Sequence, residues 1–382
     1  MENRDIRSLN RARVLAAIVA QGRIARSQLV AATGLSKASI SRVTRELLDD
    51  GLVVSDGSQP ETLRVHADAF AACGVDLGAT SARFVVINAH GEVVGFTAQP
   101  TPRDADPAGL AAWIVANVAE VTSGRPGPRF ITMGVPGVVD PHTSMITEAP
   151  NLPAVESGVF LDALEAEWPE HLRLDNDANL AVLGEHVWNG FGPDSTTVML
   201  TLSTGIGAGV ILGGELLRGR DGRVGELRMI PLGVGPDRIE DVLSGAGVAA
   251  FARSRSLGPG TPADLLRGTS DGHRELRRRA HAGLELAASI AVVAYEASTL
   301  IVGGALSEPL ADEIDAVAET IRRRFGADTR VMVTSLGDLA FVAGTLALSV
   351  DRAFASLGVA RSTLATAEVT TAIGQLRTMI GP

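Results

Sequence analysis

The chain has 382 residues, 46% of them hydrophobic, which is more than one globular core usually holds, so two or three domains are expected. Its net charge of −10 argues against a protein that binds nucleic acid over its whole surface. The single cysteine, Cys73, excludes a disulfide framework and a cysteine-rich zinc site.

Charge is divided unequally along the chain. Residues 1–66 carry ten Lys or Arg against seven Asp or Glu, whereas the remainder carries twenty-four against thirty-seven. A small basic module joined to an acidic body is expected when only the first part contacts phosphate groups. The charged start of the chain contains no apolar signal core, so we expect a cytoplasmic protein.

Three helices are predicted within the first fifty residues. The first follows Asn10, a suitable N-cap, and the second extends from about Arg26 to Thr33. Gly34 supplies the turn that two crossing helices need, and Ser36 caps the third helix. Ala25 occupies the cap position of the second helix and cannot cap it with its side chain.

The third helix has an apolar face formed by Ile40, Val43, Leu47 and Leu48, and its other faces are polar and cationic. Short polar side chains and cations suit a major groove, because bulk would block entry and positive charge offsets phosphate. Two strands, 52–54 and 62–65, around a turn at residues 56–60 complete a winged helix-turn-helix. The residues predicted to contact DNA are Ser36, Lys37, Ala38, Ser39, Ser41, Arg42 and Arg45.

The alternative for this segment is a three-helix protein-interaction module with a solvated polar face. Acidic residues are absent from Gly22 to Arg45 and reappear as Glu46, Asp49 and Asp50. This distribution favours DNA binding, because carboxylates are missing from the stretch that would enter the groove.

Two glycine hairpins of the kind that bind phosphate follow in the body. The first contains Asp76, Gly78 and Thr80, and the second lies within residues 198–212. Backbone N–H groups and a hydroxyl in such turns can hold a phosphate, and the aspartate can hold Mg²⁺ or a bridging water. Two such hairpins suggest a duplicated fold with a ligand between its halves, and the alternative for each is a turn that serves packing alone.

A long apolar stretch, residues 284–306, could suggest a membrane span. Glu285 and Glu296 interrupt it, and Gly303 and Gly304 follow near its end. We therefore predict a buried helix followed by a core strand, and no membrane contact.

Three further motifs complete the pattern: Asn176-Asp177-Ala178-Asn179, Gly225-Glu226, and Gly303-Gly304. With them the chain resembles the ROK family (repressor, open reading frame, kinase), and the added winged helix resembles its regulator branch, similar to repressors of xylose, N-acetylglucosamine and glucose-uptake genes. The resemblance implies an α/β protein: a winged helix-turn-helix followed by a two-lobed actin-like ATPase fold of the ribonuclease H-like, sugar kinase type. The expected domains are 1–68 (DNA-binding), 69–190 (lobe 1), 191–350 (lobe 2) and 351–382 (C-terminal extension).

The resemblance also implies residue roles. In the family's kinases, the aspartate matching Asp177 is the catalytic base that takes a proton from a sugar hydroxyl. The sugar-binding set that it implies is Asn151, Asn176, Asp177, Glu226, Met229 and Glu240. The set on the nucleotide side, if retained, is Asp76, Gly78, Thr80, Thr204, Gly205, Gly207 and Gly304.

Departures from the family pattern concern Ser81, where the family's kinases frequently have lysine, and one loop. Members usually read Gly-Glu-x-Gly-His, with the histidine joining three cysteines around structural zinc, whereas this chain has Arg228 and Met229 there and no cysteine after Cys73. We therefore expect no metal and no resident cofactor. Arg228 could pair with Glu226, could reach a ligand carboxylate or phosphate, or could point to solvent.

A complete winged helix beside an altered sugar loop favours a transcriptional repressor of carbohydrate-metabolism genes. It would bind a palindromic operator in double-stranded DNA as a homodimer or homotetramer, and respond to a sugar or sugar derivative. The alternative is an ATP-dependent sugar kinase with an accessory DNA-binding domain, the only case that requires ATP and Mg²⁺. A carbohydrate-binding structural protein has little support. The final stretch, 369–380, could dock on the body, stabilise a dimer or form a loose tail.

Overall fold

The computed structural model describes residues 3–57, 61–125, 127–233, 235–326, 328–359 and 366–380. The chain forms two compact units, each assembled from separate segments of sequence. Unit 1 comprises Met1–Met133, Ser157–Leu174 and Thr345–Pro382, and unit 2 comprises Gly134–Glu156 and Asp175–Gly344. The predicted boundary at 190 falls inside unit 2 and the one at 350 falls inside unit 1. The domain limits given above remain a prediction.

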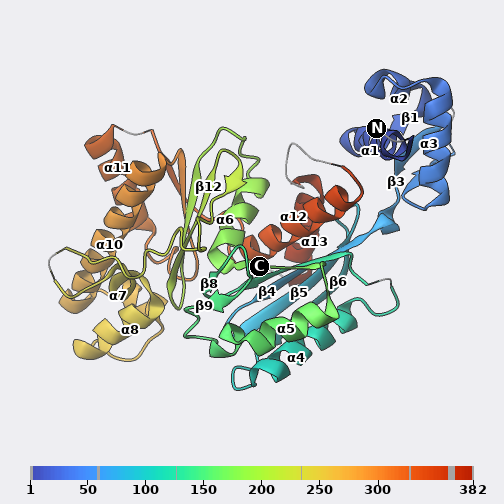
Figure 1. The fold of residues 1–382 in the computed structure, drawn as a ribbon. Helices are drawn as coiled ribbons and strands as arrows, with labels where there is room; N and C mark the ends of the chain where they lie inside the picture. The colour runs from blue at the N-terminus through green and yellow to red at the C-terminus, as the bar shows by residue number, and fades with distance from the viewer. Residues whose placement is uncertain are drawn as a thin grey trace. The chain divides into compact units, whose positions relative to one another are not determined.

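Unit 1 begins with three helices and a small sheet, as the sequence predicts (Figure 1). The helices are α1 (Asn3–Gln21), α2 (Arg26–Thr33) and α3 (Lys37–Asp49). The strands are β1 (Ile24–Ala25), β2 (Val53–Ser55) and β3 (Thr62–Val65), in the order β1-β3-β2. Leu15, Leu29, Leu47 and Leu63 are fully buried and form the core of this domain. The predicted hairpin is confirmed, β1 was not predicted, and residues 58–60 of the wing turn lie outside the described residues.

The first helix starts earlier than the sequence suggested. It begins at Asn3, so Asn10 lies inside it and the prediction that Asn10 is its N-cap is wrong. Contacts of Arg7 with α3 account for the added turns: its Nη2 donates to Glu46 Oε1 at 2.8 Å and its Nε donates to Glu46 Oε2 at 3.3 Å. Asparagine is only mildly unfavourable within a helix, so these tertiary contacts outweigh its preference for a cap.

The rest of unit 1 is a five-stranded sheet with helices on both faces. The strands are β4 (Ala71–Leu77), β5 (Ser81–Asn88), β6 (Val93–Pro100), β7 (Phe130–Val135) and β10 (Leu172–Asn176), in the order β10-β7-β4-β5-β6. The helices are α4 (Pro107–Val121), α5 (Gly158–Glu167), α12 (Leu339–Ser356) and α13 (Thr366–Ile380), with a 3₁₀ turn at Ala67–Ala69. In Figure 1, α4 and α5 lie side by side on one face of the sheet, and α12 and α13 lie on the other.

The C-terminal helix docks on unit 1. Val369, Ala372, Ile373 and Leu376 are fully buried. Gln375 Oε1 accepts from Val93 N at 2.7 Å, so α13 is bonded to the start of β6. Of the alternatives left open by the sequence, the structure favours docking on the body over a loose tail.

Unit 2 contains a second five-stranded sheet, in the order β13-β12-β11-β14-β15. Its strands are β11 (Thr197–Leu202), β12 (Ile206–Leu212), β13 (Glu215–Leu216), β14 (Thr299–Gly303) and β15 (Arg330–Val333). Its helices are α6 (Asp177–Trp188), α7 (Ile239–Leu243), α8 (Gly245–Ser254), α9 (Pro262–Arg267), α10 (Asp271–Tyr295) and α11 (Ala311–Phe325). A short hairpin, β8 (Val138–Val139) and β9 (Ile146–Thr147), and the 3₁₀ turn Pro153–Glu156 complete it.

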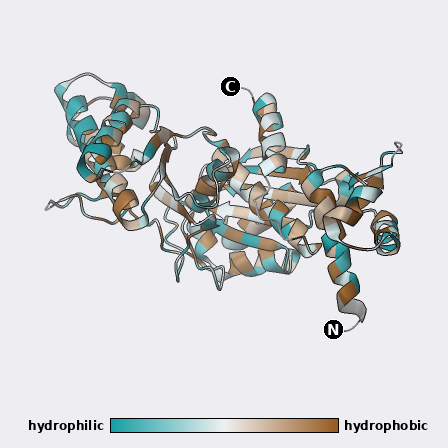
Figure 2. Ribbon diagram, turned by 90° about the horizontal axis from the view of Figure 1, so that it is seen from above, coloured by the Kyte–Doolittle hydropathy of each residue, from teal (hydrophilic) through white to brown (hydrophobic). Residues whose placement is uncertain are grey.

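The order of α10 and β14 confirms the predicted buried helix followed by a core strand. In Figure 1, α10 and α11 lie side by side. Figure 2 shows hydrophilic segments beside hydrophobic ones along the helices of this part of unit 2, as expected for helices with one face against a core.

One helix among the described residues, α12, has the length and apolar composition that a membrane span requires. Of its apolar window, 61% is buried inside the protein. A buried core helix meets the same criteria, so this helix is only weak support for a membrane span.

Candidate DNA-binding and ligand-binding sites

The third helix presents the side chains predicted to contact DNA. Gly34 has φ of 68°, a left-handed conformation that ends α2, and Ser36 Oγ accepts from Ser39 N at 3.2 Å to cap α3. Ile40, Val43 and Leu47 are buried on the inner face. The predicted contact residues are exposed, apart from the half-buried Ser39: Ser36, Lys37, Ala38, Ser39, Ser41, Arg42 and Arg45. Their contact with DNA remains a prediction.

Thr44 is a polar residue of α3 that packs on the inner face. Its side chain is fully buried, and Oγ1 donates to the Ile40 carbonyl oxygen at 2.8 Å. Threonine is short enough to pack inside when its hydroxyl bonds to the preceding turn of its own helix, so its polarity did not force it outward.

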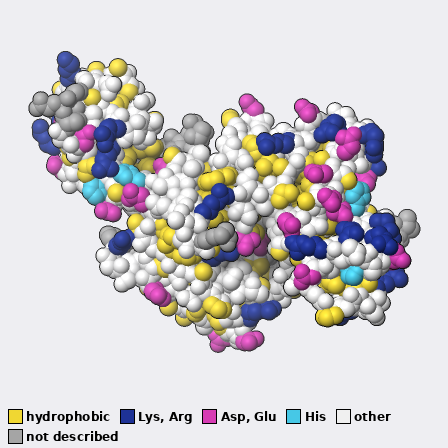
Figure 3. All heavy atoms as spheres, turned by 180° about the vertical axis from the view of Figure 1, so that it is seen from behind, with side chains coloured by type: hydrophobic (Ala, Val, Ile, Leu, Met, Phe, Trp, Pro, Cys, Tyr) yellow, Lys and Arg dark blue, Asp and Glu magenta, His cyan; other side chains and the backbone are white. Residues whose placement is uncertain are grey.

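Cations of the N-terminal domain fall into two groups. Away from the exposed face of α3, several arginines pair with carboxylates of the same domain, as Arg11 does with Asp50 and Arg23 with Asp56 at 3.3 Å, and Arg13 donates to the Thr33 carbonyl oxygen at 2.7 Å. Within the described part of the chain, Lys37, Arg42 and Arg45 have no carboxylate within ion-pair distance. In Figure 3, Lys and Arg side chains, in dark blue, lie on the visible face of this domain together with Asp and Glu side chains, in magenta. The cations of α3 therefore remain available to phosphates.

In unit 2, the start of α6 positions the first residues of the predicted sugar set. Asn176 caps α6 by accepting from Asn179 N, and its Nδ2 donates to the Gly137 carbonyl oxygen at 2.8 Å. Asp177, the first residue of the helix, accepts from Ala178 N through Oδ1 at 2.7 Å. An amide and a carboxylate thus stand at a helix N-terminus beside the β8–β9 hairpin.

Buried Asp175 supports this arrangement. Its side chain is 2% exposed, Arg218 donates to its Oδ2 from Nη2 at 2.6 Å and from Nε at 2.9 Å, and Asn179 Nδ2 donates to its Oδ1 at 3.1 Å. Two N–H groups of one guanidinium, both on Oδ2, compensate the buried charge. Through this pair Arg218 fixes the segment after β13, which leads to Glu226, relative to α6.

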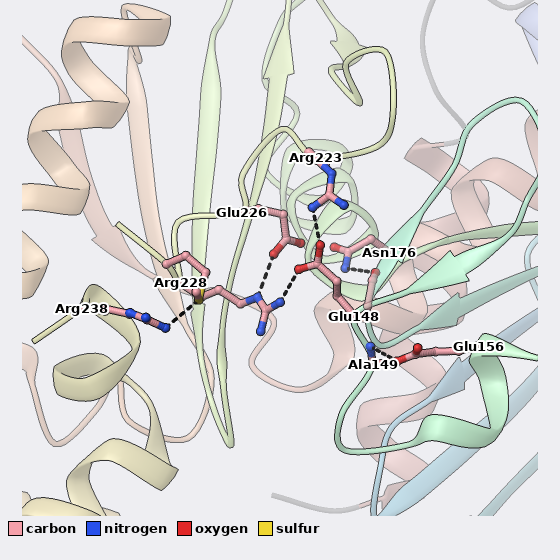
Figure 4. A network of polar contacts seen from close by, with 10 residues as sticks. Glu148, Ala149, Glu156, Asn176, Arg223, Glu226, Arg228 and Arg238 are labelled. Carbon is pink, nitrogen blue, oxygen red and sulfur yellow. Dashed lines mark hydrogen bonds and ion pairs between the residues drawn. The ribbon is translucent and has the colours of Figure 1, made fainter. Parts of the chain in front are cut away.

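Four charged side chains converge beyond that segment (Figure 4). Arg223 and Arg228 both donate to Glu148, each to a different carboxylate oxygen, and Arg228 Nε lies 3.5 Å from Glu226 Oε2. Arg228 is thus paired, and the expectation that it could point to solvent is wrong. Hydrogen bonds, first from Arg223 and then from Arg228, lower the pKa of Glu148, whereas burial raises the pKa of Glu226.

Sequence reasoning missed Glu148 and Arg223. Glu148 stands three residues before Asn151, in a loop where its φ of 57° is left-handed, and nothing in its local pattern indicates a partner 75 residues away. We shall call Glu148, Arg223, Glu226 and Arg228 the arginine cluster.

The other predicted sugar residues lie around this cluster. Glu240 N donates to the Arg228 carbonyl oxygen at 3.3 Å, and Met229, 50% exposed, accepts through sulfur from Arg238 Nη1 at 3.2 Å. Asn151 is exposed, at the end of the loop that carries Glu148. The structure therefore brings Asn176, Glu226, Met229 and Glu240 to the same region, and their role in binding a sugar remains a prediction.

The loop that lacks the family's zinc ligands is held by other contacts. Pro231 and Arg238 form a bridge, Leu232 N donates to the Asp237 carbonyl oxygen at 2.7 Å, and Asp237 pairs with Arg279 of α10 at 3.0 Å. Over the described residues, no group of three or more His, Cys, Asp or Glu is arranged to hold a metal ion. Backbone pairing and an ion pair fix this loop.

The second glycine hairpin is part of unit 2. Its turn exposes Thr204, and Gly245 N at the start of α8 donates to the Ser203 carbonyl oxygen at 2.8 Å. Gly304 has φ of 86°, and a Cβ there would lie 2.4 Å from the Leu202 carbonyl oxygen, so only glycine fits. A Cβ on Gly205 would lie 3.6 Å from Glu240 Oε1, so this hairpin lies beside the predicted sugar residues.

At the first hairpin, in unit 1, the aspartate is paired with an arginine of the neighbouring strand. Asp76 and Arg83 face each other across β4 and β5, and Arg83 Nη1 donates to Asp76 Oδ2 at 3.0 Å. Asp76 is 9% exposed. This pair occupies Oδ2 of Asp76, and the role of Asp76 toward Mg²⁺ or a bridging water remains a prediction. Gly78 N donates to the Ser81 carbonyl oxygen at 3.0 Å, and Thr80 is exposed.

A surface hollow of about 360 Å³ lies elsewhere in unit 2, between α10 and α11. Arginines of α10 line it, and Arg277 donates to the carbonyl oxygens of Leu266 and Gly268 and lies 3.6 Å from Glu313. These bonds tie the two helices to neighbouring loops, and the predicted sugar residues are not among those that line the hollow.

The fold and these sites define a class of protein: a winged helix-turn-helix joined to an α/β body that contains two glycine hairpins. Residues 72–352 match the ROK family and residues 8–60 match the MarR family. Since the first match covers more than half of the chain, the protein belongs to the ROK family, and it carries a MarR-type winged helix-turn-helix domain. The fold class predicted from the sequence is confirmed.

Both regulators and kinases resemble the chain. It is 27% identical over 233 residues to the xylose repressor of Caldicellulosiruptor bescii, with 58% of each chain covered. It is 30% identical over 287 residues to the glucokinase of Streptomyces coelicolor, with 66% of this chain and 86% of that protein covered. A crystal structure of a ROK family transcriptional regulator, a homologue of the E. coli MLC protein, has the same fold over 97% of this chain and 99% of its own, with a TM-score of 0.73 and 18% identity.

Proposed function

We propose that this protein is a transcriptional repressor of carbohydrate-metabolism genes, and that it responds to a sugar or sugar derivative bound beside the arginine cluster. One observation carries the proposal: α3 of a complete winged helix-turn-helix presents Lys37, Arg42 and Arg45 without carboxylate partners among the described residues. A ROK domain is joined to it. A cytoplasmic location follows from the proposal, because the operator is there.

The proposed contact with DNA follows from the chemistry of α3. Its N-terminal residues are short and polar, so the helix can enter a major groove, while Arg42 and Arg45 supply positive charge. A homodimer or homotetramer would place two such helices on a palindromic operator, with half-site centres about 10 or 20 bp apart.

Control by a ligand requires linkage between the two sites. A sugar releases DNA only if it binds the DNA-incompatible arrangement of the protein more tightly than the DNA-bound one. Asn176, Asp177, Glu226 and Glu240 offer the carboxylates and amide that bind several hydroxyls of one sugar.

The test uses the full chain and the DNA upstream of its own gene. We expect a shift of that DNA at low salt, weakened by Arg42→Ala and by Lys37→Ala. Arg220→Ala is the matched control. This substitution removes the same charge, and Arg220 lies in the body, where its side chain is 91% exposed. No shift at low salt, or equal binding by all three variants, would contradict the proposal.

A sugar kinase is the second candidate, and Asp177 favours it, since this aspartate stands at the start of α6 beside the hydroxyl-binding residues. The Asp76–Arg83 pair is an argument against it. Conversion of ATP to ADP in the presence of an aldose, abolished by Asp177→Asn, would show a kinase. We expect no such activity.

A further inference from the structure

The arginine cluster holds an anionic group that the protein itself supplies, the carboxylate of Glu148. Arg223 and Arg228 approach Glu148 from one segment of chain, and each donates to a separate oxygen of its carboxylate (Figure 4). Two guanidinium groups on one carboxylate form the arrangement that proteins use to recognise carboxylate or phosphate ligands.

Glu148 occupies this place in an unfavourable backbone conformation. Its φ of 57° is left-handed, a region that residues other than glycine rarely adopt. Such strain persists only where surrounding contacts hold it, and it gathers at ligand-binding sites. The side chain of Glu148 is 30% exposed, so its carboxylate can turn into water when another anion takes its place.

Exchange of Glu148 for a ligand anion conserves the ion pairs of the cluster. After the exchange, the two guanidinium groups are paired with the ligand anion instead of Glu148. The ligand anion loses its hydration, and the released Glu148 carboxylate becomes hydrated in its place. Arg228, with 22% of its side chain exposed, also retains Glu226 at 3.5 Å, so it stays oriented during the exchange.

Groups suited to hydroxyls surround the same place. Asn176 lies beside Glu148 in Figure 4, and Glu240 is bonded through its backbone to Arg228. A ligand that used the whole region would carry both an anionic group and several hydroxyls.

We infer that the effector of this protein is an anionic sugar derivative, a sugar acid or a sugar phosphate, whose anionic group displaces Glu148 from Arg223 and Arg228. This inference rests on the proposed function, since it specifies the ligand of the same site. The carboxylate that now fills the place favours a sugar acid over a phosphate.

The experiment measures the affinity of the full chain, at fixed ionic strength, for sugars in matched neutral and anionic forms. The probes are glucose, galactose, xylose and N-acetylglucosamine, the aldonate and uronate of each of the first three, and the phosphate esters of all four. We expect at least one anionic form to bind at least tenfold more tightly than its neutral parent, and the aldonate, uronate and phosphate arms identify the source of the charge.

Variants test whether Arg223 and Arg228 bind the anionic group of the ligand. Arg228→Gln and Arg223→Gln should each lower the ratio of anionic to neutral affinity about tenfold or more, Arg228→Lys should lower it less, and Glu148→Gln should raise it several-fold. Arg220→Gln, in the same segment and 91% exposed, should leave it unchanged. A ratio is insensitive to a general loss of folded protein, and circular dichroism confirms that each variant folds.

Failure of the inference and failure of the proposed function give different results. If neutral sugars bind as tightly as every anionic form and still release DNA, the inference is wrong and the repressor function stands. If an anionic sugar binds as expected but the protein shifts no DNA, the repressor function is wrong and the ligand class stands. If no anionic form binds, the inference is overturned.

Discussion

Cations are used in opposite ways in the recognition helix and in the arginine cluster. Among the described residues, Lys37, Arg42 and Arg45 of α3 have no carboxylate partner, whereas Arg223 and Arg228 share Glu148 within unit 2. A cation without an internal partner is ready for a phosphate that is always present on DNA. A cation with an internal partner responds only to an anion that competes with that partner. Under the two proposals above, this difference would separate constant attraction to DNA from selective recognition of an anionic ligand.

The largest effect should come from breaking a pair that is wholly structural. Arg218→Ala leaves the buried carboxylate of Asp175 without its guanidinium, so we expect a loss of about 3 kcal/mol in the free energy of unfolding. Urea denaturation measures it. Arg220→Ala, which removes an exposed arginine two residues away, should cost less than about 0.5 kcal/mol. Equal losses would show that Asp175 does not depend on Arg218.

Removal of two cations that have no carboxylate partner among the described residues should weaken DNA binding and leave the stability of the fold nearly unchanged. We expect Lys37→Ala combined with Arg42→Ala to weaken operator binding by about 2 kcal/mol, roughly 30-fold, and to reduce the slope of log affinity against log salt by about 2. The unfolding free energy should change little, because both side chains are exposed. A salt titration of DNA binding checks the prediction, and an unchanged slope would place these cations away from the phosphates.

Neutralising Glu148 should have an effect that depends on pH. Its pKa is lowered by bonds to Arg223 and Arg228, so its pairing contributes stability above the unfolded pKa, and this contribution is lost as pH falls through the folded pKa. We expect Glu148→Gln to cost about 1 kcal/mol at pH 7 and nearly nothing once the pH is below the folded pKa. Denaturation curves at several pH values test this, and a cost independent of pH would assign it to packing or backbone strain.

The smallest effect should come from a paired cation at the surface of the N-terminal domain. Arg7→Ala removes the ion pair with Glu46, and since Arg7 is 63% exposed we expect a loss of about 0.5 kcal/mol in stability. Operator binding should fall less than in the Lys37 and Arg42 variant. A DNA-binding loss as large as that of the α3 cations would remove the distinction between paired and unpaired arginines.

Local patterns predicted much of the fold. The period of Ile40, Val43 and Leu47, the cap at Ser36 and the turn at Gly34 fixed two helices and their junction, because caps, turns and amphipathic periods act within a few residues. Asn10 failed as a cap, since the ion pair between Arg7 and Glu46 of α3 stabilises the turns of α1 that precede Asn10. The difference lies in the range of the interactions that decide each case.

The candidate site was predictable only in part. Asn176, Glu226 and Glu240 could be proposed from motifs, but their approach to one another depends on how distant segments pack. Glu148 could not be predicted as a site residue, because its partners lie 75 and 80 residues later in the chain.

The sequence by itself determined the two-part organisation of this protein, its family, and a DNA-binding helix rich in short polar and cationic side chains. Only the tertiary structure decided which arginines of the body are already paired with a carboxylate. Arg83 is opposite Asp76, Arg218 is against Asp175, and Arg223 and Arg228 meet at Glu148. Ion pairs depend on distances in space, which the folding of remote segments sets and no local pattern encodes.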